Sequence, residues 1–279
     1  MTTLKITASD INTLRKQTGA GMMDCKKALT EANGDFEKAI ELLRKKGQKL
    51  AAKRSDREAA EGVVIARSNA DNTQGIIICL NCETDFVAKN DDFVGFAEQI
   101  ADIALKNQPS TLEELKKLPF DDKVNIEEKI LENITKIGEK VELSGYEKIE
   151  SETVYAYIHP GNRVGSVVGV TKSDEAAQAV AKDLALQVAA MAPIALDKDG
   201  VPDDMIQKEI EIGKEQARAE GKPEQILEKI AMGKLNKFYG EVTLLNQAFI
   251  NDGKKTVKQY LQEIDKDLTV KGFKRFSLS

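Results

Sequence analysis

Residues 84–93 form the sequence Thr84-Asp85-Phe86-Val87-Ala88-Lys89-Asn90-Asp91-Asp92-Phe93. This mostly polar stretch follows the apolar run Ile76-Ile77-Ile78-Cys79-Leu80, which is typical of a buried strand. It leads into the spacing of Phe93, Phe96, Ile100, Ile103 and Ala104, which predicts a helix. Phe86 therefore lies in a polar turn between the two. An apolar ring in such a turn either folds back onto the local core, which is the usual outcome, or projects as an anchor for a partner's pocket.

The order of strand, turn, strand and helix around this stretch occurs a second time further along the chain. The first unit has strands at 63–67 and 75–80, a turn at 69–72 and a helix at 91–106. The second has strands at 153–158 and 164–171, a turn at 160–162 and a helix at 173–191. The repeat predicts an α+β fold with two related subdomains, 62–145 and 146–279, each a small antiparallel sheet with helices on one face.

The second subdomain carries an insertion. From about 203 to 238 the sequence is helical and highly charged, and Gly221-Lys222-Pro223 divides it. A short break between two helices predicts an antiparallel helical hairpin. Strand-like sequence returns at Val242-Thr243-Leu244-Leu245 and at Phe273-Lys274-Arg275-Phe276, with a helix at 256–264 between them. The hairpin is therefore expected to protrude from the subdomain.

The first 47 residues predict a compact three-helix module. Thr7 or Ser9 can cap the first helix, Gly19-Ala20-Gly21 and Asn33-Gly34 end the first two, and Asp35 caps the third. Residues 48–61 are charged and alanine-rich, which suits a linker or a helical extension. Met22 and Met23 are neighbours at the start of the second helix, and adjacent helical side chains cannot share one face. At least one of them is expected to be exposed, where methionine suits an adaptable contact surface.

Composition and charge narrow the class of protein. Residues 1–60 carry a net charge of +5 and the remainder −10. The basic segment either binds an anionic partner or is an ordinary solvated helix face. The net negative charge of the whole chain argues against general nucleic-acid binding.

The sequence shows no sign of a membrane span or a signal peptide. No apolar run reaches the length of a membrane span, and the start of the sequence lacks the apolar core of a signal peptide. Three cysteines do not make a disulfide scaffold, which favours a reducing, cytoplasmic location.

The sequence gives little support for catalysis. Its single histidine, His159, precedes Pro160 in a turn, with no nucleophile beside it in the sequence. Cys79 and Cys82 have C-x-x-C spacing, but Cys79 lies in the apolar strand rather than at a helix start, where a reactive thiol is expected. A zinc site would need a second ligand pair. No glycine-rich phosphate loop occurs, so we expect no nucleotide, metal or other cofactor bound to the chain itself.

Two long motifs resemble those of a known family. The segment Leu14-Arg15-Lys16-Gln17-Thr18-Gly19-Ala20-Gly21-Met22-Met23-Asp24-Cys25-Lys26-Lys27-Ala28-Leu29, followed by Asn33-Gly34-Asp35, resembles the opening of bacterial elongation factor Ts. Thr84-Asp85-Phe86-Val87-Ala88-Lys89-Asn90 resembles the second hallmark of that family. His159 with Gly161, Arg163-Val164-Gly165, and Gly240-Glu241-Val242 are similar to its later segments, so the resemblance runs from about Ile6 to Phe276.

The resemblance implies a guanine-nucleotide exchange factor, not a nucleotide-hydrolysing enzyme, that acts on elongation factor Tu. It implies a ubiquitin-associated-like N-terminal module and a core of two subdomains, with a coiled-coil hairpin in the second. In the family, the Phe of this motif enters the partner's GTPase domain and helps to dislodge Mg²⁺. That role falls on Phe86, flanked by Thr84, Asp85 and Val87. Further partner contacts fall on Arg15, Met22, Met23 and His159. A C-terminal module found in some members is not expected after Ser279.

Two other classes of function remain open from the residues alone. A nucleic-acid-binding module would use the basic N-terminal segment and would show steep salt dependence. A thiol enzyme would need a reactive thiolate at Cys79 or Cys82, which thiol titration would detect.

Overall fold

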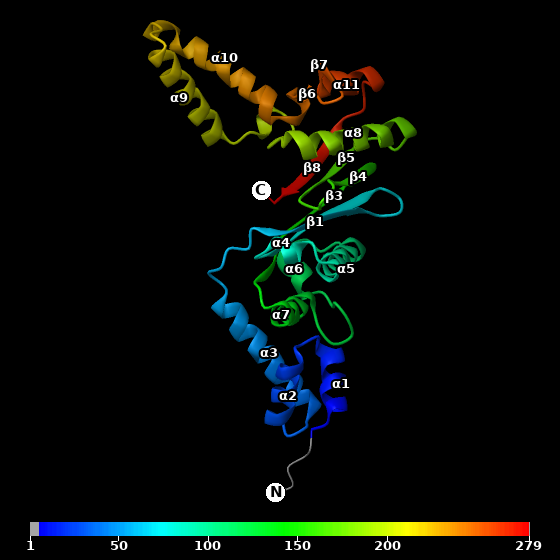
Figure 1. The fold of residues 1–279 in the computed structure, drawn as a ribbon. Helices are drawn as coiled ribbons and strands as arrows, with labels where there is room; N and C mark the ends of the chain where they lie inside the picture. Colours follow the sequence, from blue (N-terminus) through cyan, green and yellow to red (C-terminus); the bar gives the residue numbers. More distant parts are fainter. Residues whose placement is uncertain (1–5, 279) are drawn as a thin grey trace.

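The computed structural model of the chain describes residues 6–278, so the expectations for residues 1–5 and 279 lie outside it. A helical module at the N-terminal end leads into a core of two sheets, and a long helical hairpin projects at the other end of the molecule (Figure 1). The α+β class, the small antiparallel sheets and the hairpin agree with the sequence predictions.

The N-terminal module consists of α1 (Ala8–Thr18), α2 (Met22–Glu31) and α3 (Phe36–Lys53). Thr7 and Asp10 form a capping box at α1, Gly19 ends it in the left-handed conformation with φ 68°, and Asp35 caps α3. The helices close over a small apolar core of Leu14, Cys25, Ala28, Leu29, Ala39 and Leu43. The third helix continues through Gly47 to Lys53, so the segment 48–61 begins as a helical extension and only its later part lacks helical structure.

The first sheet contains β1 (Glu61–Ser68), β2 (Gln74–Cys82) and β3 (Val141–Glu150), in that order and all antiparallel. Sequence reasoning missed β3, because its polar residues, such as Glu142 and Ser144, interrupt any apolar run. The expected boundary between 145 and 146 falls inside this strand. Since β3 pairs with β2 from Gln74↔Glu150 to Cys82↔Val141, the whole strand belongs to the first sheet.

Helices cover the outer face of this sheet. They are α4 (Asp85–Ala88), α5 (Asp91–Asn107), α6 (Leu112–Lys117) and α7 (Ile126–Ile137). The apolar face predicted for α5 is buried: Phe93, Phe96, Ile100 and Ala104 share one core with Ile65, Ile78 and Leu80 of the strands. Burial of these large side chains fixes α5 on the sheet, and with it the position of the short α4 just before it.

The second sheet contains β4 (Thr153–Ile158), β5 (Val164–Val170) and β8 (Val270–Ser277). The outer face is covered by α8 (Glu175–Met191), whose Val180, Leu184 and Val188 are fully buried. The predicted strand at 242–245 is wrong. The helix before it runs on to Val242, and Leu244–Asn246 forms a 3-10 turn, η2, whose apolar Leu244 is buried in the core. The strand-like pairing of this segment is an isolated bridge between Thr243 and Ala195.

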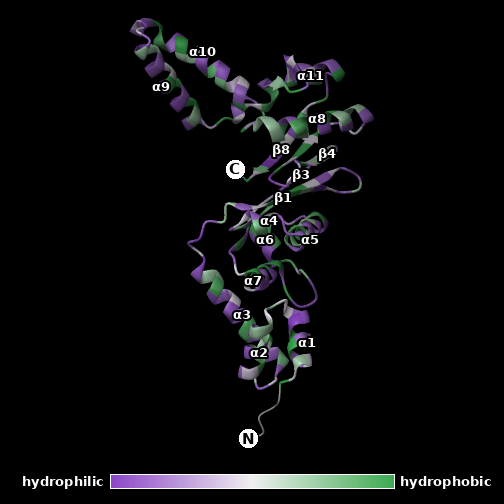
Figure 2. Cartoon of the chain, viewed as in Figure 1, coloured by the Kyte–Doolittle hydropathy of each residue, from purple (hydrophilic) through white to green (hydrophobic). Residues whose placement is uncertain are grey.

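The helical hairpin consists of α9 (Asp203–Ala219) and α10 (Glu224–Val242). The two helices alternate hydrophilic and hydrophobic residues along their length, as an amphipathic pair does (Figure 2). They pack closely at Gly213, where a Cβ would lie 3.1 Å from Cα of Ala231. The remaining elements are η1 (Lys198–Gly200), β6 (Ala248–Phe249), β7 (Asp252–Thr256) and α11 (Val257–Ile264).

The two three-stranded sheets pack face to face. Their shared core contains Val64, Ala66, Ile77 and Cys79 from the first sheet, and Val154, Val167 and Leu278 from the second subdomain. Each hairpin turn also bonds to the opposite sheet. The carbonyl of Asn72 accepts from the N–H of Val154 at 2.6 Å, and the carbonyl of Asn162 accepts from the N–H of Val64 at 2.7 Å. Helices, sheet, sheet and helix therefore form four layers, and the related units face each other.

Among residues 6–278, no helix is both long and apolar enough to cross a membrane.

Candidate partner-binding surface

Phe86 projects into solvent. Its side chain is 83% exposed, more than any other large apolar side chain described, so the ring does not fold back onto the core. The expected turn is in fact one turn of helix, α4, in which Ala88 is buried and Val87 is half-buried against the first core. One side of this turn is held by the core, and Phe86 lies on the other side.

Thr84 precedes this helical turn and is held from a distant part of the chain. Its main-chain N–H donates to Oε2 of Glu139 at 3.1 Å, and its hydroxyl donates to Oε1 of the same carboxylate at 2.7 Å. The carbonyl of Thr84 accepts from the thiol of Cys82 at 3.2 Å. Thr84 therefore fixes the start of α4 through its hydrogen bonds with Glu139 and Cys82.

Asp85 and Lys89 form an ion pair along the solvent side of α4, with 2.7 Å between Oδ2 and Nζ. The hydrogen bond from Lys89 lowers the pKa of the Asp85 carboxyl. Both side chains are exposed to solvent, so the pair contributes little to stability. Its effect is to place a paired negative and positive charge together on the solvent side of the helical turn that carries Phe86.

Asn90 separates the short helix from the next one. Its N–H donates to the carbonyl of Val87, and its side-chain oxygen accepts from the N–H of Asp92 and caps α5. A shallow hollow beside Phe86 is lined by Val87 and Asn90, together with Asn133, Lys136 and Ile137 from the end of α7. The ring of Phe86 thus stands at the rim of a partly apolar depression.

The N-terminal module presents a second exposed apolar patch. Met22 is 52% exposed and Met23 is 73% exposed at the start of α2, which confirms that at least one of the pair lies outside the core. Arg15 is also exposed, in the last turn of α1. Gly19, whose N–H donates to the carbonyl of Arg15 at 2.8 Å, ends α1 shortly before α2 begins at Met22. The structure therefore leaves all three predicted contact residues accessible.

His159 lies in the turn between β4 and β5. The ring is exposed, and its Nδ1 lies 3.0 Å from the hydroxyl of Tyr157. The turn sits beside the start of β1, because Arg163 pairs with Glu61. Since Glu61 is the register partner of Cys82, His159 belongs to the same end of the two sheets as the segment that carries Phe86.

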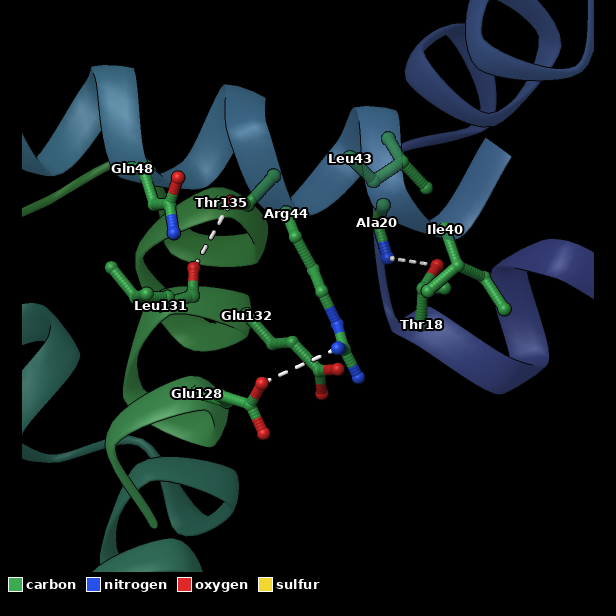
Figure 3. Close-up of a pocket in the computed structure, with 10 residues that line it drawn as sticks. All are labelled: Thr18, Ala20, Ile40, Leu43, Arg44, Gln48, Glu128, Leu131, Glu132 and Thr135. Carbon is green, nitrogen blue, oxygen red and sulfur yellow. Dashed lines mark hydrogen bonds and ion pairs between the residues drawn. The ribbon is translucent and has the colours of Figure 1, made fainter. Parts of the chain in front are cut away.

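A joint between α3 and α7 attaches the N-terminal module to the core. Arg44 reaches Glu128 at 3.3 Å across a small pocket that is also lined by Ile40, Leu43 and Leu131 (Figure 3). A Cβ on Gly47 would lie 2.6 Å from Oγ1 of Thr135, so the two helices cross in close contact there. The patch at Met22 and Met23 is therefore held against the core that carries Phe86.

The cysteines are poor nucleophiles in this setting. All three are buried and none forms a disulfide. Burial raises the pKa of Cys79, and burial together with the charge of Glu139 raises the pKa of Cys82 to about 12. A thiolate is the reactive form of cysteine, so both environments oppose a thiol mechanism. Among the residues that the structure describes, no group of three or more His, Cys, Asp or Glu side chains is arranged to hold a metal ion.

Sequence reasoning missed Glu139, Glu83 and Arg54, which support the start of α4. The guanidinium of Arg54, which ends α3, reaches Glu83 at 2.6 Å, directly before Thr84. None of the three residues lies in a recognisable motif, and their contacts join segments far apart in the chain.

Exposed apolar side chains carried by a packed framework are characteristic of a protein that binds another protein. A family model described as Elongation factor TS matches residues 83–279. Elongation factor Ts of Christiangramia forsetii is 52% identical over 274 residues, which cover 98% of this chain and 99% of that protein. Those of Amoebophilus asiaticus and Cytophaga hutchinsonii are 54% and 50% identical, each over 98% of this chain and 98% and 99% of their own lengths. The chain belongs to the elongation factor Ts family of translation elongation factors.

Proposed function

We propose that the chain binds elongation factor Tu in its GDP-bound form and accelerates the release of GDP and Mg²⁺, so that GTP can bind. Membership of the elongation factor Ts family supports this assignment. The observation that carries it is the exposure of Phe86, a large apolar ring whose side chain is 83% exposed. Such a partner would place the chain in the cytoplasm.

The energetics require several contacts rather than one. A 10⁴-fold faster release needs roughly 5.5 kcal/mol of differential stabilisation. Burial of one phenylalanine supplies only about 1.5–3 kcal/mol. The exposed side chains of Met22 and Met23 offer further apolar area, and Arg15 and His159 offer hydrogen bonds. In this proposal Phe86 and its neighbours Thr84, Asp85 and Val87 disturb the Mg²⁺ and nucleotide site, while the other contacts hold the complex together.

Exchange of this kind needs no nucleotide-binding site on the chain itself. Coupling between two ligands of one protein is reciprocal, so a factor that weakens GDP binding to elongation factor Tu must bind less tightly when GDP is present. The nucleotide-free partner is therefore expected to bind most strongly.

The test is to mix the chain with elongation factor Tu loaded with fluorescently labelled GDP and to follow the release of the label. We expect catalytic amounts of the chain to accelerate release, without hydrolysis of nucleotide. Unchanged release at saturating concentrations would refute the proposal. The nucleic-acid alternative predicts instead that the full chain binds many RNA or DNA sequences with a steep dependence on salt.

A further inference from the structure

The turn that follows α7 contacts both the start of α4 and the end of α3. Gly138 adopts the left-handed conformation with φ 82° and its N–H donates to the carbonyl of Ile134, which ends the helix. The next two residues, Glu139 and Lys140, then face the segment before Phe86. This places a charged two-residue segment where two distant parts of the chain meet.

The first contact is the carboxylate of Glu139 on Thr84. One oxygen accepts from the hydroxyl and the other from the main-chain N–H, so both donors of Thr84 are used. A threonine before a helix usually caps it by accepting from the N–H two or three residues ahead. Thr84 makes no such side-chain cap. The direction in which α4 leaves the sheet is therefore set by Glu139 rather than by a local cap.

The second contact joins the same turn to the N-terminal module. Oε1 of Glu83 accepts from the main-chain N–H of Lys140 at 2.6 Å and from the Arg54 guanidinium at 2.6 Å. The ammonium of Lys140 donates to the carbonyls of Ser55 and Arg57, at 3.1 and 3.3 Å. Hydrogen bonds thus connect both the residues before Phe86 and the residues after α3 to the two-residue segment Glu139-Lys140.

A helix of one turn cannot hold its own shape in water, because nucleation costs more than its few hydrogen bonds return. The orientation of Phe86 must therefore come from ties to the rest of the fold. At the end of α4, Ala88 is buried and Asn90 caps the next helix. At its start, Glu139 supplies the only side-chain acceptor for Thr84 among the hydrogen bonds of the described residues.

We propose that Glu139 is a positioning residue for Phe86: its two-oxygen contact with Thr84 holds α4 so that the ring points outward in one orientation. This inference rests on the proposed exchange function. An oriented ring enters a partner's site without first losing rotational freedom, so loss of Glu139 should slow the exchange step more than it weakens binding.

The first experiment is a double-mutant cycle on exchange by the full chain. Glu139→Ala should lower the maximal rate of GDP release about five- to tenfold, as expected for losing hydrogen bonds to a charged acceptor. The half-saturating concentration should change less than about twofold. In the Phe86→Ala background the same substitution should cause no further loss. If the fold-loss in maximal rate of the double variant equalled the product of the fold-losses of the two single variants, Glu139 would act independently of Phe86, and the proposal would be overturned.

Glu127→Ala is the matched control. Glu127 is an exposed glutamate in the first turn of α7, at the opposite end of the helix from Glu139, so this variant removes the same charge without touching Thr84. It should exchange at the wild-type rate. Thr84→Val keeps only the main-chain N–H donor to Glu139, so its maximal rate of GDP release should fall between those of the wild type and of Glu139→Ala.

The second experiment needs no partner. Because the chain contains no tryptophan, Phe86→Trp introduces a single tryptophan at the ring position, whose fluorescence can be excited selectively over that of the tyrosines. Adding Glu139→Ala should lower the fluorescence anisotropy of this reporter, while Glu127→Ala should not. Unchanged anisotropy in a folded Glu139→Ala variant would overturn the positioning role. The anisotropy measurement is independent of the exchange proposal. A chain that fails to accelerate GDP release would refute the exchange function, but the anisotropy would still decide whether Glu139 orients the ring at position 86.

Discussion

Gly75 of β2 lies directly against Val154 of β4: a Cβ on the glycine would lie 2.6 Å from Cγ1 of the valine. The reciprocal contact occurs at Gly165 of β5, where a Cβ would lie 2.8 Å from Cγ1 of Val64. The two repeated units therefore bury a glycine of one against a valine of the other, and the missing side chains allow the sheets to approach.

Gly75→Ala should consequently destabilise the fold by about 1–3 kcal/mol, because the added methyl group overpacks a closed interface. The denaturation midpoint measures this change. Gly95→Ala is the control, since a Cβ at Gly95 meets nothing within 4 Å and the residue lies within α5. That control should be neutral or slightly stabilising. Equal effects of the two substitutions would contradict the close approach of the sheets.

Phe86→Ala should leave the fold nearly as stable as the wild type and should slow GDP release about 10- to 100-fold, which corresponds to the loss of one buried aromatic contact with the partner. Truncation of a core phenylalanine would instead cost about 3–5 kcal/mol of stability. Phe93→Ala, at a ring that is only 2% exposed, provides that comparison. Paired measurements of unfolding and release distinguish the cases. A strongly destabilised Phe86→Ala whose folded fraction exchanges normally would refute the contact role.

Arg15→Ala combined with Met23→Ala should weaken the complex more than it slows release at saturation. These side chains lie on the N-terminal module and are expected to contribute binding rather than displacement of the nucleotide. Isothermal titration with nucleotide-free elongation factor Tu and a release assay at saturating chain measure the two effects separately. A larger effect on the saturated rate would give the module a direct part in exchange.

Cys79→Ala combined with Cys82→Ala should leave exchange largely intact. Both thiols are buried and their pKa values are raised, so neither is suited to thiolate chemistry. The double variant should lose about 1–2 kcal/mol of stability through reduced packing. Urea denaturation and the release assay check the two statements. A tenfold loss of exchange in a folded double variant would revive a chemical role for the cysteines.

Glu83 should make the fold sensitive to acid. Burial alone would raise the pKa of this carboxyl, but the N–H of Lys140 and the guanidinium of Arg54 together lower it below its usual value of 4.5. The folded state thus favours the ionised form, which stabilises the fold above the ordinary pKa, and this contribution is lost as pH falls through the lowered value.

Glu83→Gln removes that contribution and should cost about 1–2 kcal/mol at neutral pH. The difference from wild type should shrink between about pH 5 and pH 3. Denaturation midpoints across that range measure it. A difference that stays constant with pH would show that the ion pair with Arg54 does not act through the charge of Glu83.

The sequence predicts those parts of the molecule in which one residue pattern decides the local structure. The apolar run at Ile76–Leu80 identified β2, and the spacing of Phe93 and Phe96 identified α5, because burial of a whole face leaves a clear periodicity. The polar residues around Phe86 did not decide whether its ring folds back onto the local core or projects into solvent. Only the fold shows that Val87 and Ala88 occupy the core side of the turn.

Other parts depend on contacts that no local pattern reports. The apolar run at Leu244 and Leu245 looks like a strand, yet these residues pack at a helix end. The strand β3 is half polar, so its pairing with β2 sets its structure. The contact between Thr84 and Glu139 spans 55 positions, and nothing in either neighbourhood indicates the other.

The two repeated units differ in how the chain passes from the second strand of the hairpin to the helix. In the second unit four residues separate the end of β5 from α8, and Asp174 caps that helix. In the first unit eight residues separate the end of β2 at Cys82 from α5, and they contain the extra turn α4. The two helices are equally long, at 17 residues each. The longer connection therefore adds a projecting turn to the first unit without shortening the helix that covers its sheet.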